Sequence, residues 1–456
     1  MMQVNSFISS FKNRRILKRL LLSAIFIIIL YVSNLFFEFI LVDNIDVFTR
    51  LMIHELYKTE DNIDVLFIGS SHCYRSLNPE MTDQYMGCNT FNAGTSAQGL
   101  DGSYALLVEA GKHNDLKQVY LEMYYGVQGI EYKDRTEMTQ TYIISDYLRP
   151  SMNKISYLLN ASEPDYWLNS FILPSRYGNK IFENKYVADN IKNKMSSEYK
   201  NYDFGDKSNG SSEYYVGKGF VVNNNVVENN EFYHKGHFAT SEIQLSSDDK
   251  NSLNKIVEYC RKRNIELVLF SAPVSDFQLV DGGNYDAYIE QVSDLAAQSH
   301  ISYYNFNLCK SEYFSYDSDL FMDSDHLNYD GANEFSKLFS EVVLGKIDNG
   351  QVFYPSYNEK LKNEGNKFLG VVSTLTYEDE KIRKYTIEPV YIAENMYDVN
   401  VYKKNTESDD YTYLTPETVE GGIEIEVPRY EEGVFKINIC SDKNTDIPVA
   451  EIKMKY

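Results

Sequence analysis

Two short polar segments, far apart in the sequence, carry residue types that can act together in acyl transfer. The first reads Gly-Ser-Ser-His at residues 69–72, directly after an apolar run, and the second reads Asp-Ser-Asp-His at residues 323–326. A serine hydroxyl becomes a nucleophile when a base takes its proton, and a carboxylate fixes the tautomer of that base. The two segments therefore offer a nucleophile, a base and an orienting acid from opposite ends of one predicted domain.

A third segment could supply donors for the negative charge that develops on an attacked carbonyl oxygen. Residues 91–96 read Phe-Asn-Ala-Gly-Thr-Ser, and the backbone of Gly94 can approach a ligand closely because glycine has no side chain. Each segment alone is also compatible with an ordinary structural role: a strand end, a turn glycine, or an Asp that bonds to nearby backbone. Their joint placement at three strand ends of one predicted sheet favours the catalytic interpretation.

The elements that position these segments follow from alternating apolar and amphipathic runs. Such β-α-β alternation predicts a parallel, doubly wound sheet, whose reactive groups collect on loops at the carboxyl ends of the strands. The predicted strands span residues 63–69, 90–92, 118–123, 266–271 and 301–306, and the main predicted helices span residues 98–112, 248–263, 285–299 and 331–344.

The predicted α/β domain covers residues 60–346 and is interrupted at about 126–245. The interruption is rich in Tyr, Asn, Ser and Lys, and a loop of this length needs structure of its own. We expect short helices, one of them near residues 151–159, that form a cap over the strand ends. His234 and His237 are spaced H-x-x-H but lack a helix pattern and a third ligand, so no metal site is predicted.

Residues 351–456 differ in texture from the domain before them. Short alternating segments separated by polar turns predict a β-sandwich-like domain. This domain could stabilise or space the chain, or it could bind glycan or wall polymer. The predicted strands span residues 368–375, 384–392, 399–403, 422–427, 434–439 and 450–455.

An apolar segment near the N-terminus indicates the compartment. Residues 20–41 are almost wholly apolar and can cross a hydrocarbon core of about 30 Å as a helix. Basic residues gather within 12–19 and two Asp residues follow the segment, so residues 1–19 are expected in the cytoplasm and the rest outside the cell membrane. A cleaved signal peptide is the alternative, but the run is long for one and no small-x-small cleavage site follows it.

Composition excludes some other classes of function. The chain has 456 residues with 66 acidic against 44 basic side chains, and this net charge of -22 argues against a nucleic-acid partner. Its five cysteines are scattered without a C-x-x-C pair, so neither a zinc or redox site nor a disulfide framework is expected.

At these residues the chain resembles the SGNH, or GDSL-like, hydrolase superfamily. Residues 69–71 match its first block, Gly-Asp-Ser, with Ser70 where Asp is usual, and this match makes Ser71 the nucleophile. Residues 92–94 resemble the second block, whose glycine donates an N–H to the oxyanion hole. The resemblance implies a flavodoxin-like sheet, an oxyanion hole that includes the N–H groups of Ser71 and Gly94, and no metal or cofactor.

The last block of the family, Asp-x-x-His, matches Asp323 and His326 and gives them the roles of orienting acid and base. Asp325 also precedes the histidine, but the family pattern favours Asp323. The third block, Gly-x-Asn-Asp, is expected after residues 118–123 and is missing, since the chain there reads Leu-Glu-Met-Tyr-Tyr-Gly. The side-chain oxyanion donor is therefore absent, and Glu122, Tyr124 or a cap residue is left to take its place.

The Gly-Ser-Ser block, the Asp-His-Leu-Asn ending and the anchor look most like one branch of this superfamily. That branch contains the D-alanine transfer protein of the teichoic-acid pathway and the exopolysaccharide O-acetylation proteins. The resemblance implies a serine acyl esterase or O-acyltransferase acting on cell-envelope or extracellular glycopolymers, with a multi-span membrane acyltransferase as candidate partner. The rival interpretation is a non-catalytic anchored protein that binds glycan or scaffolds a polymer-acylation system.

Overall fold

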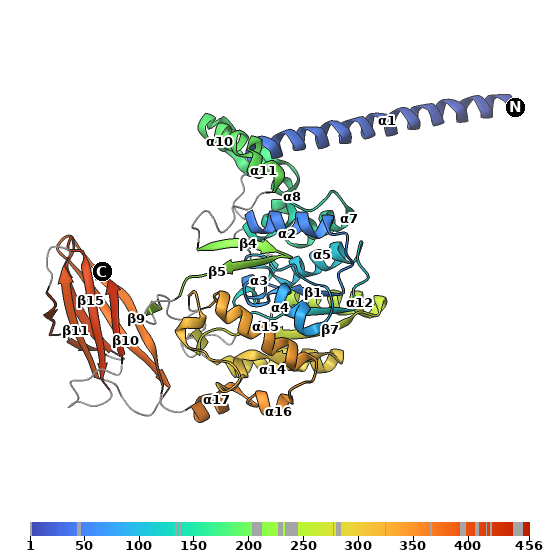
Figure 1. Ribbon diagram of the computed structural model, residues 1–456. Helices are drawn as coiled ribbons and strands as arrows, with labels where there is room; N and C mark the ends of the chain where they lie inside the picture. Colours follow the sequence, from blue (N-terminus) through green and yellow to red (C-terminus); the bar gives the residue numbers. More distant parts are fainter. Residues whose placement is uncertain are drawn as a thin grey trace.

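The computed structural model describes most of the chain, and three parts can be distinguished in it (Figure 1). A long apolar helix leads into a mixed α/β body, and antiparallel strands follow the body. The pair His234 and His237 lies outside the described residues. The described residues are 2–42, 47–132, 135, 138–202, 212–226, 231–232, 245–276, 278–279, 284–323, 325–364, 367–392, 398–405, 410–415, 417–419, 422–440 and 450–456.

A five-stranded parallel sheet forms the centre of the body, with the order β2-β1-β3-β7-β8. Each strand lies within a predicted one, so the predicted parallel sheet is confirmed. Phe67 of β1 pairs with Asn92 of β2 and with Tyr120 of β3, so the loops after these three strands leave the sheet at one edge. The strands are β1 (Val65–Ile68), β2 (Thr90–Asn92), β3 (Gln118–Glu122), β7 (Glu266–Ser271) and β8 (Ser302–Asn305).

Alternate residues of the central strands belong to two different cores. Leu66 and Ile68 pack on one face of the sheet, whereas Val65 and Phe67 pack on the other. This alternation is what a strand buried on both faces requires. The first face is covered by α5 (Leu100–Ala110), α12 (Ser247–Arg263) and α14 (Tyr285–Ser299), and the second by α3 (Ser71–Ser76), α4 (Pro79–Met86) and α15 (Tyr329–Val343).

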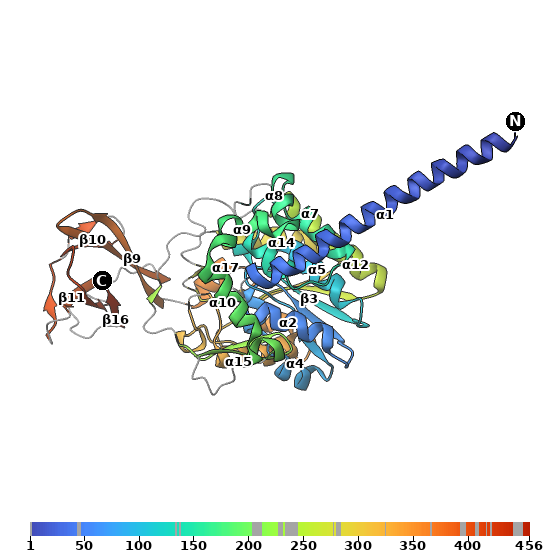
Figure 2. The ribbon, with the colours of Figure 1, turned by 90° about the horizontal axis from the view of Figure 1, so that it is seen from above.

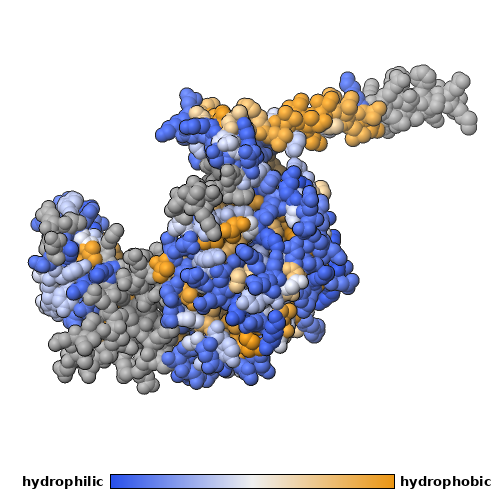
Figure 3. All heavy atoms as spheres, in the orientation of Figure 1, coloured by the Kyte–Doolittle hydropathy of each residue, from blue (hydrophilic) through white to orange (hydrophobic). Residues whose placement is uncertain are grey.

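The N-terminal helix α1 (Met2–Leu41) projects from the body (Figures 1 and 2). Its segment Ile16–Leu41 is long and apolar enough to cross a membrane, and its surface is exposed and hydrophobic (Figure 3). This is compatible with a signal anchor or a single span. The last carbonyls of a helix lack partners within it, and here Tyr186 donates to Leu41 O (2.6 Å) and Asn190 to Ile40 O (3.2 Å).

The described residues between β3 and α12 include a set of helices and a hairpin. The helices pack against α5 and the end of α1, and α7 confirms the helix predicted near residues 151–159. A hairpin instead reaches the end of β2, where Asn92 N–H donates to Lys218 O (2.9 Å). The helices are α6 (Thr139–Ser145), α7 (Met152–Asn160), α8 (Pro164–Phe171), α9 (Leu173–Tyr177), α10 (Asn184–Met195) and α11 (Ser197–Asn201), and the hairpin strands are β4 (Glu213–Gly217) and β5 (Phe220–Asn223).

Three further helices were not predicted. Helix α2 (Val47–Lys58) follows α1 and buries Leu51, Met52 and Leu56 in the first core. Helices α16 (Asn349–Val352) and α17 (Tyr357–Glu364) follow α15.

The C-terminal strands form two sheets, with the orders β13-β14-β10-β9-β6 and β12-β11-β15-β16, and the short strand β6 comes from before α12 and pairs parallel with β9. Side chains of both sheets, among them Ile387, Ile425, Val401 and Ile437, share one core. All six strands predicted within residues 351–456 are present in these two sheets. The strands are β6 (Glu231–Phe232), β9 (Lys367–Glu378), β10 (Ile382–Ile392), β11 (Asp398–Asn405), β12 (Thr412–Tyr413), β13 (Glu417–Val419), β14 (Gly422–Pro428), β15 (Gly433–Cys440) and β16 (Ala450–Lys455).

Candidate active site

The turn after β1 holds Ser70 inside the protein and presents Ser71 at the start of α3. Ser70 is fully buried and caps the helix by accepting the His72 N–H (3.2 Å). Glu122 accepts hydrogen bonds from the Ser70 N–H and hydroxyl, both at 2.9 Å. Gly69 has to be glycine because a Cβ there would lie 2.4 Å from the Glu122 Cβ. The buried carboxyl group of Glu122 thus fixes the turn from inside the protein, and Ser71 remains partly accessible.

His326 connects Ser71 with Asp323. Its Nε2 lies 2.8 Å from Ser71 Oγ, and its Nδ1 lies 3.0 Å from both carboxylate oxygens of Asp323. The same carboxylate accepts the backbone N–H groups of Asp325 (2.8 Å) and His326 (2.7 Å), which fix its position. The structure therefore brings together the three residues that the sequence proposed as nucleophile, base and acid, and it places Asp323 rather than Asp325 on the imidazole.

The ionised state of Asp323 suits a neighbouring His326 that acts as a base toward a hydroxyl. Burial raises the pKa of Asp323, but the hydrogen bond and charge of His326 outweigh burial and hold the pKa below its ordinary value. An ionised Asp323 draws the imidazole proton to Nδ1 and leaves the lone pair of Nε2 directed at Ser71. This is the arrangement that general-base activation of a serine requires.

His72 packs between the rings of Tyr124 and His326. The ring centroids are 3.6 Å apart for His72 and Tyr124 and 4.4 Å apart for His72 and His326, with both pairs stacked. Burial lowers the pKa of His72 well below its usual range, and the charge of Arg75 and the charge that His326 carries when protonated lower it further. A neutral His72 therefore packs against the His326 ring without adding a competing charge.

The two N–H groups predicted for an oxyanion hole, those of Ser71 and Gly94, differ in their hydrogen bonding. Among the described residues, no hydrogen-bond acceptor is found for the Ser71 N–H, which leaves it available at the first position of α3. The Gly94 N–H, in contrast, already donates to the side chain of Asn92 (3.1 Å). The reason is local, because an Asn side-chain oxygen readily takes the N–H two residues ahead.

The side chain of Asn92 also braces α3 by donating to Cys73 O (2.9 Å) and Leu77 O (3.0 Å). Two side chains, Glu122 and Tyr124, were expected as replacements for the missing Asn oxyanion donor of the third block. Both make other contacts. Glu122 is buried beneath the turn, and Tyr124 stacks on His72. Burial raises the pKa of Glu122 to about 7, although the hydrogen bonds from Ser70 lower it.

One edge of the site is contributed by the hairpin β4–β5. Arg75 of α3 forms an ion pair with Glu213 of β4, and it also contacts Met322 Sδ (3.5 Å) next to Asp323. The hairpin is therefore linked to both halves of the site.

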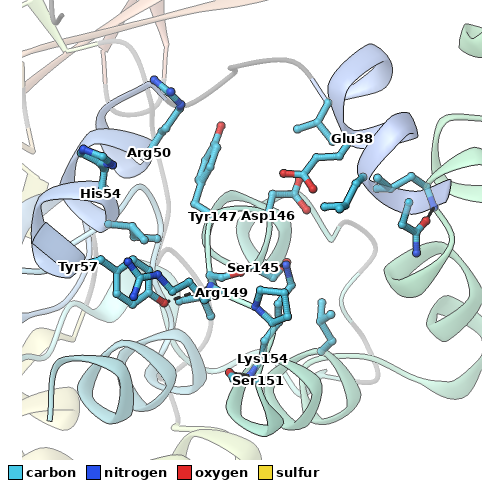
Figure 4. Close-up of a pocket in the computed structure, with 18 of the residues that line it drawn as sticks. Glu38, Arg50, His54, Tyr57, Ser145, Asp146, Tyr147, Arg149, Ser151 and Lys154 are labelled. Atoms are coloured by element: carbon cyan, nitrogen blue, oxygen red, sulfur yellow. Dashed lines mark hydrogen bonds between the residues drawn. The ribbon is translucent and has the colours of Figure 1, made fainter. Parts of the chain in front are cut away.

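Two cavities are lined by other residues of the chain. One of about 280 Å³ is lined by loops after β2 and β3 and includes the ion pair of Arg135 and Asp101 (2.9 Å). The other, of about 680 Å³, lies at the end of α1, and its lining includes none of Ser71, Asp323 and His326 (Figure 4).

Sequence reasoning missed His72 and Arg75, and it named Glu122 in a different role. The position of His72 directly after the serines was visible, but only the fold places its ring against His326. Glu122 could have been recognised as a charged residue at the end of an otherwise apolar strand, where a buried carboxylate needs a nearby donor.

Comparisons with known proteins give little further information. No known family model matches the chain, and no curated protein matches it. One similar solved structure is a candidate platelet activating factor from Streptococcus pneumonia, with 11% identity and a TM-score of 0.32, covering 65% of this chain and 91% of that one. Another is a candidate acylhydrolase from Bacteroides fragilis, with 8% identity and a TM-score of 0.30, covering 64% and 94%. Likenesses at these TM-scores establish neither fold nor function.

Proposed function

We propose that this chain is an extracytoplasmic serine acyl esterase or O-acyltransferase of the SGNH type, acting on ester groups of cell-envelope or extracellular glycopolymers. The observation that carries the proposal is the contact of His326 with Ser71 Oγ at 2.8 Å on one side and with Asp323 at 3.0 Å on the other. The strand order β2-β1-β3-β7-β8, which is that of flavodoxin-like doubly wound sheets, supports it.

The reaction follows from these contacts. Ser71 Oγ attacks the ester carbonyl while His326 Nε2 takes its proton, and Asp323 stabilises the imidazolium that forms. The tetrahedral intermediate collapses when His326 returns the proton to the departing alcohol, which leaves an acyl group on Ser71. Water or a sugar hydroxyl then attacks this acyl group, with His326 again as base, and frees Ser71. The Ser71 N–H is the available donor to the oxyanion.

A fluorophosphonate probe tests the proposal, because it reacts with an activated serine. We expect the full chain in detergent to be labelled at Ser71, and Ser71→Ala to abolish labelling with an unchanged circular dichroism spectrum. Ser70→Ala is the matched control and should retain labelling, since Ser70 faces Glu122. A folded wild-type chain that stays unlabelled would contradict the enzymatic assignment.

The non-catalytic alternative is favoured by the missing Asn and by the Gly94 N–H that is already engaged. Glycopolymer binding that equals that of wild type in Ser71→Ala, together with an unlabelled wild type, would establish this alternative. For a labelled wild type, comparing acyl release with and without a glycan acceptor distinguishes hydrolysis from transfer. A multi-span membrane acyltransferase that supplies acyl groups to this chain would favour transfer over hydrolysis.

A further inference from the structure

The cavity of about 680 Å³ lies where α1 meets the body (Figure 4). Its walls come from the last turns of α1, from α2 and from the segment that joins α6 to α7. In Figure 4, Arg50, His54 and Tyr57 of α2 lie opposite Glu38 of α1. If α1 crosses a membrane, this cavity is at the level of the lipid headgroups.

The charge of the cavity contrasts with that of the chain. Five basic side chains line it against two acidic ones, Glu38 and Asp146, whereas the whole chain has 44 basic and 66 acidic residues. Asp146 is already paired with Arg176, which donates to both of its oxygens (2.9 and 3.1 Å). The basic residues are Arg50, Lys58, Arg149, Lys154 and Lys194.

Arg50 is the most informative of these residues. Its side chain is buried, with 6% exposure, and no carboxylate pairs with it among the described residues. The guanidinium lies over the rings of Tyr199 (3.6 Å) and Tyr202 (3.9 Å) and donates one hydrogen bond to Tyr199 O (2.9 Å). A guanidinium has five donors, and a bound anion would offset the cost of burying this one.

Other side chains around the cavity agree with a site for an anion. Arg149 lies over the ring of Tyr57 (4.1 Å), and Lys154 donates to the backbone of Leu148 (3.2 Å). Burial lowers the pKa of Lys154, and the charges of Asp146 and Glu38 partly offset this effect. Burial lowers the pKa of His54, and the charges of Lys58, Arg50 and Arg149 lower it further. Positive potential is therefore concentrated on the α2 side.

The helices around the cavity expose apolar side chains. Met152 and Ile155 on α7, Leu168 on α8 and Phe182 in the segment before α10 are all exposed, and so is Trp167, the single tryptophan of the chain. Exposed apolar residues with a tryptophan, next to the end of an apolar helix, are typical of a surface that contacts the membrane interface.

We propose that this cavity binds the phosphate headgroup of an anionic membrane lipid, with Arg50 as the main anchor and Arg149 and Lys154 as further donors. The inference depends on α1 crossing the membrane as a single span. It does not depend on the reaction proposed at Ser71. Guanidinium groups bind phosphate through paired hydrogen bonds. The apolar residues of α1 and α7 then adjoin the acyl chains, which a free anion would not need.

Trp167 provides the test, because brominated lipids quench tryptophan only at short range. The full chain in nanodiscs of brominated phosphatidylcholine should show quenched fluorescence. Adding unbrominated phosphatidylglycerol should restore fluorescence about tenfold more effectively than adding unbrominated phosphatidylcholine. In Arg50→Met, which retains a long side chain over the tyrosine rings, this preference should fall about tenfold, the effect of one lost charge-assisted hydrogen bond.

Controls distinguish a lipid site at Arg50 from a soluble-anion site and from a general effect of surface charge. Lys262→Met removes a charge from the exposed surface of α12 and should leave the preference unchanged. Arg149→Gln, at an exposed position, should weaken the preference if Arg50→Met fails to fold. An absence of quenching, an equal response to the two lipids, or a preference retained in both Arg50→Met and Arg149→Gln would overturn the proposal. Loss of the preference in millimolar inorganic phosphate would assign the cavity to a soluble anion instead.

Discussion

The two serines of the turn after β1 differ in their environment although they are adjacent. Ser70 is fully buried and donates to Glu122, whereas Ser71 begins α3 and faces His326. Through Glu122, the network beneath Ser71 is tied to β3, the central strand of the sheet.

Substitutions at the base and its acid should have unequal effects. His326→Ala should abolish turnover of an activated ester, because His326 Nε2 is the hydrogen-bond partner of Ser71 Oγ among the described residues and would accept its proton. Asp323→Asn should reduce kcat by about 10²–10⁴-fold, since it disturbs the tautomer and the stabilisation of the imidazolium while Ser71 and His326 remain. If Asp323→Asn had wild-type kcat, Asp323 would not be the orienting acid.

Glu122 should make stability depend on pH. Its pKa is raised by burial to about 7 from 4.5, so the folded state binds the proton more tightly than the unfolded state. Stability from this group is therefore full below about pH 4.5 and falls as the pH rises to about 7, by roughly 3 kcal/mol at most. Melting curves should show a smaller decrease between these pH values for Glu122→Gln than for wild type.

Asp83 offers a control for Glu122. It is partly exposed on α4, and Asp83→Asn should leave the pH dependence between 4.5 and 7 as in wild type. The same slope in wild type and Glu122→Gln would contradict a protonated Glu122 beneath the turn.

The contact of Ser71 with His326, and of His326 with Asp323, could be predicted from the sequence because each residue lies in a short motif with its own spacing. The contacts of the residues around these three could not be predicted from the sequence. His72 meets His326 only after two distant loops reach one sheet edge, and the Gly94 N–H turns inward because of the Asn92 side chain. Neither contact has a sequence signal that separates it from an ordinary turn.

At the scale of elements, helix α17 is held to the body by a buried ion pair. Lys360 Nζ lies 2.7 Å from Asp276, with side-chain exposures of 0% and 2%. Removing one partner of such a pair leaves a buried charge, which typically costs about 3–5 kcal/mol. Lys360→Ala should therefore lower the free energy of unfolding of the body by about this amount, measured by urea denaturation.

A double variant checks the cause. Lys360→Met combined with Asp276→Asn removes both charges and should regain a large part of the loss. Lys362→Ala, on the exposed side of the same helix, should change stability by less than about 1 kcal/mol. Equal stability of Lys360→Ala and wild type would show that the pair does not hold α17.

Sheet strands were predicted more completely than the surrounding helices. The strands β1, β3 and β7 are apolar runs ended by glycine or polar residues, and burial on both faces leaves little ambiguity. Helix α2 was missed because Asp43 and Asp46 suggested only the flank of the membrane segment. The hairpin β4–β5 lies in a largely polar part of the sequence and was not predicted. It contacts β2 and α3, which are distant in the sequence.

For the whole molecule, the charge around the apolar segment predicts its orientation. Protease added to intact spheroplasts should degrade the α/β body and the C-terminal strands, while an epitope placed before residue 12 stays protected until the membrane is permeabilised. Extraction at alkaline pH should leave the full chain in the membrane fraction. Protection of the body in intact spheroplasts would reverse the proposed topology and exclude envelope polymers as substrates.

The most direct measurement is the mass of the acyl-enzyme. The full chain is mixed with p-nitrophenyl acetate, quenched with acid within the first turnover, and digested for peptide mass spectrometry. The proposed mechanism predicts one acetyl group on Ser71, which accumulates in wild type and is lost in Ser71→Ala and His326→Ala. Acetylation at other positions only, or equal acetylation of Ser71 in wild type and His326→Ala, would contradict a His326-activated serine nucleophile.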